Sequence, residues 1–151
     1  NFELTGFCDA FYGSGDPEKA RSTSGSMYFL SGGVVHFSSS LQKIMAQSTT
    51  ETELIAMSTC AKQGIYLFGI LGELGWKNFG SVCIFCDKKL ALLVAGQGNH
   101  GSRSKHLAIR LAGLRDWINQ RQIIIDHVPT KNQLSDMLTK FCSRPTFSTL
   151  L

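Results

Sequence analysis

The sequence predicts an α/β domain built on a mixed β-sheet, and three observations predict it. Residues 4–10 and 82–87 are short apolar runs that each end in an aspartate, and a long segment with helical periodicity separates them. Residues 26–30 and 34–38 are β-rich runs on either side of a Ser-Gly-Gly turn, which is typical of a hairpin. A strand, a helical crossover and another strand favour a right-handed βαβ unit, so we expect the two aspartate-tipped strands to be parallel.

The composition indicates one globular domain with a real core. The chain has 151 residues, of which 43% are hydrophobic and 17% charged, as in ordinary soluble proteins. We find no apolar run as long as a membrane span and expect no membrane partner. The chain starts at Asn1, so we expect a fragment or a processed product. The net charge of +4 leans towards an anionic partner, although many enzymes share so small an excess.

The five cysteines indicate reduced thiols in an intracellular compartment. Their number is odd, and their spacing is unlike a disulfide framework. Cys83 and Cys86 form a C-x-x-C pattern, which in other settings marks a redox pair or a zinc site. Because residues three apart on a strand point to opposite faces, the pattern here favours two small core residues.

The first half of the chain predicts a three-stranded antiparallel meander followed by a long helix. Residues 11–25, which carry Lys19 and Arg21, are expected to form a long loop that is either solvated or functional. Two overlapping capping boxes, Ser48-x-x-Glu51 and Thr50-x-x-Glu53, leave the helix start uncertain by one turn. The helix is expected to end near residues 72–75, and its buried stripe consists of Leu54, Met57, Ala61, Ile65, Phe68 and Leu71.

The second half predicts strands at 81–86 and 123–128, a short helix at 90–95 and a longer one at 105–120. Basic residues near the longer helix are either a solvated face or contacts to a phosphate backbone: Arg103, Lys105, Arg110, Arg115 and Arg121. The pattern Thr130-x-x-Gln133 predicts a capping box that opens a last short helix. Residues 1–141 are expected to form the domain, and residues 142–151 an irregular tail.

Carboxylates gather where the predicted strands end. Asp9 and Asp87 lie at the tips of the two parallel strands, at the carboxyl edge where open α/β sheets bind ligands. Glu53 adjoins the buried stripe in the first turn of the helix, where it either serves the helix terminus or aims at this edge. Paired carboxylates suit a hard cation such as Mg²⁺.

Seven blocks of the sequence, spread along nearly the whole chain, form a recognisable series. They are Gly6-Phe7-Cys8-Asp9-Ala10, Arg21-Ser22-Thr23-Ser24-Gly25, residues 47–54, Phe85-Cys86-Asp87, Ser104-Lys105-His106-Leu107 with Ile109-Arg110, Val128-Pro129-Thr130 and residues 133–140. With the order of elements and acids, they resemble the RNase H fold, and more narrowly the RNase H domain at the end of the Pol polyprotein of copia-type (Pseudoviridae) LTR retrotransposons.

The resemblance implies an RNase H-like three-layer α/β/α fold with a mixed five-stranded sheet. Its strands 1, 4 and 5 would be parallel, and helices would cover both faces. It implies a ribonuclease H that hydrolyses the RNA strand of RNA–DNA hybrids with two Mg²⁺ ions, or with Mn²⁺ as a substitute. The implied catalytic residues and metal ligands are Asp9, Glu53, Asp87 and Asp136. Glu53 is preferred to Glu51 because the family's ligand precedes a bulky residue.

The resemblance also implies an RNA–DNA hybrid and the reverse transcriptase domain of the same polyprotein as partners, in a cytoplasmic particle or the nucleus. Lys88 stands where the family has a small polar residue, and Ala108 replaces an acid. The alternative is therefore a catalytically weak or inactive RNase H-fold module that binds nucleic acid or protein; a further rival cleaves DNA with the same acids. The expected nucleic-acid contacts are Arg21, Ser22, Thr23, Lys88, Lys105, His106 and Arg110.

Overall fold

The computed structural model describes residues 3–13, 21–76, 80–96, 105–141 and 144. Five strands form one sheet in the order β3-β2-β1-β4-β5. The first three strands are antiparallel neighbours, and β4 and β5 run parallel to β1, as the sequence predicts. The strands are β1 (Leu4–Phe11), β2 (Thr23–Leu30), β3 (Gly33–Leu41), β4 (Val82–Cys86) and β5 (Ile123–His127).

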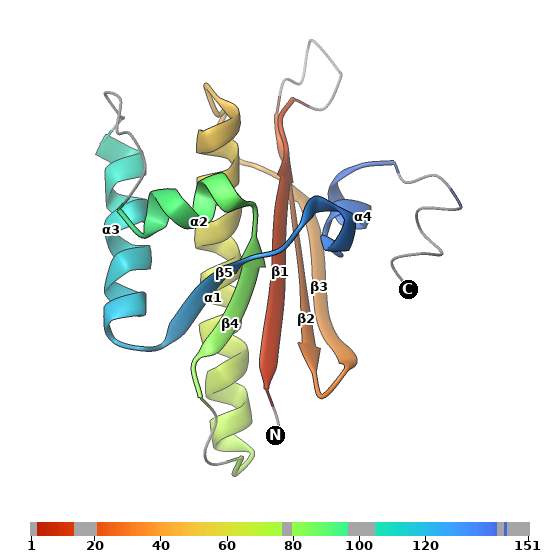
Figure 1. Cartoon of the computed structure of the whole chain (residues 1–151), viewed down its shortest axis with the longest axis vertical. Helices are drawn as coiled ribbons and strands as arrows, with labels where there is room; N and C mark the ends of the chain where they lie inside the picture. The colour runs from red at the N-terminus through yellow and green to blue at the C-terminus, as the bar shows by residue number, and fades with distance from the viewer. Residues whose placement is uncertain (1–2, 14–20, 77–79, 97–104, 142–143, 145–151) are drawn as a thin grey trace.

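The helices lie on both faces of the sheet, which gives three layers (Figure 1). Helices α1, α2 and α3 stand on one face, and the short α4 lies against β1, β2 and β3 on the other. The RNase H-like architecture expected from the sequence is therefore confirmed. The helices are α1 (Thr49–Glu73), α2 (Lys88–Val94), α3 (Lys105–Asn119), the 3-10 helix η1 (Thr130–Asn132) and α4 (Asp136–Thr139).

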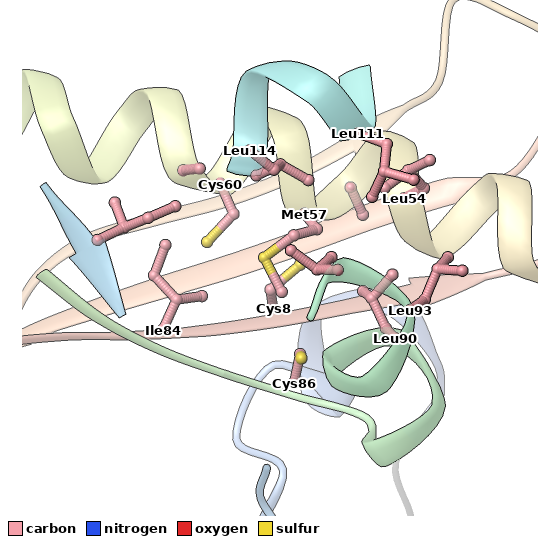
Figure 2. Close-up of a cluster of buried hydrophobic side chains, with 14 of the residues drawn as sticks. Cys8, Leu54, Met57, Cys60, Ile84, Cys86, Leu90, Leu93, Leu111 and Leu114 are labelled. Atoms are coloured by element: carbon pink, nitrogen blue, oxygen red, sulfur yellow. The ribbon is translucent and has the colours of Figure 1, made fainter. Parts of the chain in front are cut away.

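The core lies between α1 and the sheet (Figure 2). The predicted stripe of α1 is confirmed, because Leu54, Met57 and Ala61 are buried and the stripe residues farther along the helix pack against the core. The expectation that no apolar run is as long as a membrane span is wrong, because α1 is long and apolar enough to cross a membrane by length and composition; here it is the central helix of this core. Cys86 is buried in the same cluster, as predicted, whereas Cys83 is half-buried on the opposite face of β4 and is not a core residue. The opposite orientations of the two thiols agree with the argument against a redox pair or a shared zinc.

Tyr28 fixes the distance between α1 and the sheet. Its ring is fully buried, and its hydroxyl donates a hydrogen bond of 2.6 Å to the carbonyl oxygen of Cys60 in α1. Two glycines make room for it. A Cβ on Gly6 of β1 would lie 2.5 Å from Cε1 of Tyr28, and a Cβ on Gly64 of α1 would lie 2.6 Å from its hydroxyl oxygen. A side chain at either position would overlap Tyr28 unless the ring or the helix shifted.

Two local predictions are wrong. The loop expected over residues 11–25 is shorter, because Phe11 still pairs with Thr23 and the hairpin arms of β1 and β2 extend into it. The capping box at Thr130 is absent: η1 begins after Pro129 without a side-chain cap, and Gln133 is buried with its amide turned towards β1. Gln133 is thus engaged in tertiary contacts that a local pattern does not reveal.

Alanine substitutions at two glycines of α1 should have opposite effects on stability. Gly64→Ala should lower the free energy of unfolding by about 1–3 kcal/mol, because the methyl group overpacks against Tyr28. Gly69→Ala should raise it by roughly 0.5–1 kcal/mol, because nothing lies within 4 Å of its Cβ and alanine favours a helix. Urea unfolding followed by circular dichroism measures both; equal effects would show that Tyr28 does not restrain α1.

Candidate active site

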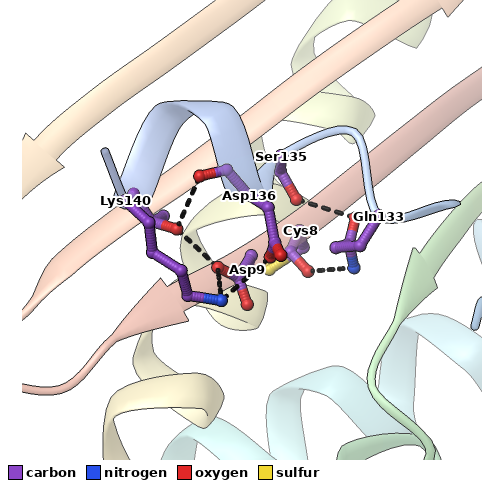
Figure 3. A network of polar contacts seen from close by, with 7 residues as sticks. Cys8, Asp9, Gln133, Ser135, Asp136 and Lys140 are labelled. Carbon is purple, nitrogen blue, oxygen red and sulfur yellow. Dashed lines mark hydrogen bonds and ion pairs between the residues drawn. The ribbon is translucent and has the colours of Figure 1, made fainter. Parts of the chain in front are cut away.

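Asp9 and Asp136 meet at one edge of the sheet although they come from opposite ends of the chain (Figure 3). Asp9 lies near the end of β1, and Asp136 is the first residue of α4. The hydroxyl of Thr139 donates a hydrogen bond to Oδ2 of Asp9. The ammonium of Lys140 lies 3.4 Å from the same oxygen and 3.1 Å from Oδ1 of Asp136. One lysine therefore bridges both carboxylates.

A buried polar network holds α4 in this place. Gln133 Nε2 donates to the carbonyl oxygen of Cys8 at 3.0 Å, and Ser135 Oγ donates to Gln133 Oε1 at 2.8 Å. On the other side, Ser39 Oγ of β3 donates to the carbonyl oxygen of Leu138 at 2.6 Å. Gly25 of β2 allows close packing, since its Cβ would lie 2.7 Å from Thr139. Because Cys8 precedes Asp9, this network also places Asp136 beside Asp9.

The two glutamates in the first turn of α1 have different environments. The helix begins after Ser48, whose hydroxyl accepts a hydrogen bond from the N–H of Glu51. The Glu51 carboxylate in turn accepts one of 2.8 Å from the N–H of Gln47, so Glu51 completes a variant of the capping box. Glu53 is half-buried, and its strongest charge interactions are with Asp87 and Asp9. Glu51 therefore caps the helix, whereas Glu53 interacts electrostatically with the other acids.

Asp87 follows β4 and caps the N-terminus of α2. Its Oδ1 accepts a hydrogen bond of 2.7 Å from the N–H of Lys89, and the residue is exposed. The cap fixes one carboxylate oxygen and orients the side chain at the carboxyl edge of the sheet.

Burial and neighbouring charges raise the pKa of two of these acids, Glu53 and Asp136. Burial raises the pKa of Glu53, and the negative charges of Asp87 and Asp9 raise it further. Burial and the charge of Asp9 raise the pKa of Asp136, while Lys140 partly opposes this shift. Although burial lowers the pKa of Lys140, the attraction of Asp9 and Asp136 outweighs it and raises the value overall. The four predicted acids thus share one electrostatic environment.

The donor set fits a hard divalent cation. Carboxylate oxygens are the ligands that Mg²⁺ and Mn²⁺ prefer, and Asp9, Glu53, Asp87 and Asp136 supply them around a place that already attracts one ammonium. Among the described residues, no three His, Cys, Asp or Glu side chains are close enough to make a preformed metal site. The acids are close enough to influence one another electrostatically. To ligate a metal together, their side chains must move closer to one another.

The candidate nucleic-acid contacts divide into exposed and buried residues. Arg21 and Lys105 are exposed, and Thr23 is half-buried at the start of β2. Arg110 Nε donates to His106 Nε2 at 3.1 Å on one face of α3. The side chain of Lys88 lies outside the part of the chain that the structure describes, as do Lys19, Arg103 and the expected tail at 142–151 apart from residue 144.

Ser22 differs from the expectation of a direct ligand contact. It is fully buried, its hydroxyl lies 3.0 Å from that of Thr52, and it accepts a hydrogen bond from the N–H of Gly13. Thr52 precedes Glu53, so Ser22 supports the first turn of α1. Arg115 is likewise engaged elsewhere, since it donates to the carbonyl oxygens of Leu93 and Val94 at the end of α2.

Sequence reasoning gave no role to Lys140 or Thr139. The sequence does contain a signal for Lys140, because an aspartate at a helix start and a lysine four residues later form an i,i+4 ion pair. That Thr139 and Lys140 also reach Asp9 follows from tertiary packing alone.

Neutralising Glu53 should stabilise the metal-free protein at neutral pH. A glutamate whose pKa is raised on folding destabilises the native state when ionised; this penalty is absent below its ordinary pKa of 4.5 and complete above the raised value. Glu53→Gln should therefore raise the melting temperature in EDTA by a few degrees at pH 8, with the difference shrinking towards pH 4. Glu51→Gln is the matched control and should give no gain, since it weakens the helix cap. A gain for Glu51→Gln alone would contradict the assignment.

Comparison with known proteins gives two kinds of relative, and no family model matches the chain. The chain is 33% identical over 144 residues to the retrovirus-related Pol polyprotein from transposon TNT 1-94 of Nicotiana tabacum, covering 95% of this chain and 11% of that protein. It thus spans about a tenth of the length of the curated relatives it matches.

Two solved structures share the fold at low identity. LC11-RNase H1 from compost, solved in complex with an RNA/DNA hybrid, matches with a TM-score of 0.65 and 16% identity, covering 90% of this chain and 93% of that one. The prototype foamy virus protease-reverse transcriptase matches with a TM-score of 0.54 and 16% identity, covering 92% of this chain and 20% of that one. The chain is therefore a homologue of one segment of the retrovirus-related Pol polyproteins of copia-type transposons, and its fold is that of RNase H domains.

Proposed function

We propose that the protein is a metal-dependent ribonuclease H that hydrolyses the RNA strand of RNA–DNA hybrids. The observation that carries the proposal is the shared electrostatic environment of Asp9, Glu53, Asp87 and Asp136 at one edge of an RNase H fold. Acids that repel one another at a folding cost are typical of a site that cations neutralise.

Different residues of the chain would have separate roles in phosphodiester hydrolysis. Asp9, Glu53, Asp87 and Asp136 would hold two Mg²⁺ ions, which when bound supply activation of the attacking water and charge stabilisation at the leaving oxygen. Thr139 orients Asp9 through its hydroxyl, and the N–H of Lys89 orients Asp87. Both contacts restrict carboxylates to directions that face the edge of the sheet.

Substrate choice would rest on the shape of the hybrid. The wide minor groove of an RNA-containing duplex displays 2′-hydroxyl groups that DNA lacks. We propose that Arg21, Lys105 and Arg110 contact the phosphate backbone. Thr23, His106 and Lys88, which follows Asp87, are the other proposed contacts to the hybrid. In the polyprotein, a reverse transcriptase domain would supply the hybrids, in a cytoplasmic particle or the nucleus.

A non-catalytic binding module is the second candidate. The ion pairs of Lys140 with Asp9 and Asp136 favour it, because they neutralise part of the acidic cluster without any metal. Such a module would bind hybrid without cutting it.

The decisive experiment is cleavage of an end-labelled RNA–DNA hybrid in Mg²⁺ or Mn²⁺, compared with Asp87→Asn. Asparagine preserves the cap of α2 but is a poorer metal ligand, so we expect a loss of about 100-fold or more in rate with the fold intact. Asp116→Asn is the matched control, because Asp116 pairs with Gln120 on the surface of α3.

Three outcomes separate the candidates. Cutting of the RNA strand that Asp87→Asn abolishes and Asp116→Asn preserves supports the enzyme. Binding of hybrid by folded wild-type protein without cutting in either metal supports the binding module. Cleavage of duplex DNA in preference to hybrid would contradict the proposed substrate.

Lys105→Gln should weaken hybrid binding and reduce its dependence on salt. Removing one phosphate contact lowers the slope of log affinity against log salt by about 1. Lys62→Gln, which removes an exposed charge from α1, is the control and should leave the slope unchanged. Fluorescence anisotropy with a labelled hybrid in EDTA measures both; an equal change in the two variants would mean that only net charge matters.

A further inference from the structure

We propose that Lys140 is a built-in counter-cation of the acidic cluster, which takes the place of a cation between Asp9 and Asp136 and must withdraw before a divalent metal binds there. The inference rests on the proposed function, because it concerns the metal site of that reaction. It assigns to Lys140 control over the metal affinity of the site.

The position of the Lys140 ammonium carries the proposal. It contacts Oδ2 of Asp9 at 3.4 Å and Oδ1 of Asp136 at 3.1 Å, and these carboxylates come from β1 and α4. Figure 3 shows the lysine side chain turned back over α4 so that its nitrogen reaches both acids. A metal ligated by both carboxylates would lie where the ammonium lies, so the two cations exclude each other by space as well as by charge.

The Lys140 side chain is freer to move than the carboxylates of Asp9 and Asp136. The side chains of Asp9 and Asp136 are only 17% and 20% exposed, and Thr139 also holds Asp9. The Lys140 side chain is 40% exposed and follows the last turn of α4, where its backbone is already extended. Its flexible stem lets the ammonium swing into water. The lysine is therefore the side chain that must leave the space between Asp9 and Asp136 before the acids can draw together around a metal.

Two consequences of opposite sign follow. Without metal, Lys140 offsets repulsion between Asp9 and Asp136 and ties α4 to β1, so removing it should destabilise the protein. With metal, the lysine is a competitor, so removing it should tighten binding. A residue that only supported the structure would lower both stability and metal affinity when removed.

The test is Mn²⁺ binding by isothermal titration calorimetry, with thermal melting in EDTA, for the wild type, Lys140→Gln and Lys140→Arg. Lys131→Gln, an exposed lysine of η1, removes the same charge from the same region and is the control. For Lys140→Gln we expect Mn²⁺ affinity about tenfold higher than in the wild type and a lower melting temperature without metal. Lys140→Arg should bind Mn²⁺ no more tightly than the wild type, and Lys131→Gln should change affinity less than about twofold.

Two other outcomes overturn the proposal and are distinguishable. If the wild type binds Mn²⁺ and Lys140→Gln binds it equally or more weakly, the lysine does not compete, and the proposed function is unaffected. If folded wild type and Lys140→Gln both fail to bind Mn²⁺, the metal site fails, and the proposed metal-dependent function fails with this inference.

Discussion

The candidate site depends on the docking of α4 against the end of β1. Asp9 alone is a carboxylate at the end of a strand, and Asp136 alone begins a helix of one turn. Gln133 joins them by donating to the carbonyl oxygen of Cys8 inside the protein, where an unpaired polar group would be costly, and Ser135 holds the Gln133 amide in place. This one buried connection determines the separation of two acids and brings Thr139 and Lys140 within reach of Asp9.

The rest of the fold supplies the other two acids on rigid supports. The glycines beside Tyr28 allow α1 to pack closely on the sheet, and Ser22 and Thr52 tie its first turn to the start of β2. Asp87 is fixed by the cap of α2 directly after a buried strand. Packing thus holds the acids close enough to repel one another. This repulsion lowers the free energy of unfolding, which is the cost of keeping the charges together.

Much of this arrangement follows from local sequence pattern. The periodicity of α1, the hairpin glycines and the two aspartates at strand ends each depend on residues close in the chain, which is why the topology and the positions of Asp9 and Asp87 could be predicted. Preferring Glu53 to Glu51 required the resemblance to a family; the structure adds the physical reason, which is that Glu51 caps the helix. The local pattern predicts a cap at Gln133 and no contact from Lys140 to Asp9, because the partners Cys8 and Asp9 lie in β1, more than a hundred positions away. No local pattern encodes such contacts.

The hydrogen bond between Thr139 and Asp9 joins positions 130 apart in the sequence, so the acidic cluster closes only when nearly the whole domain is present. During synthesis β1 leaves the ribosome early, and Asp9 gains these partners only after the segment that carries Asp136 and Lys140 has been made. A chain that lacks its last segment therefore lacks Asp136, Thr139 and Lys140 and cannot complete the acidic cluster. The cluster thus forms last, after every strand of the sheet has been made.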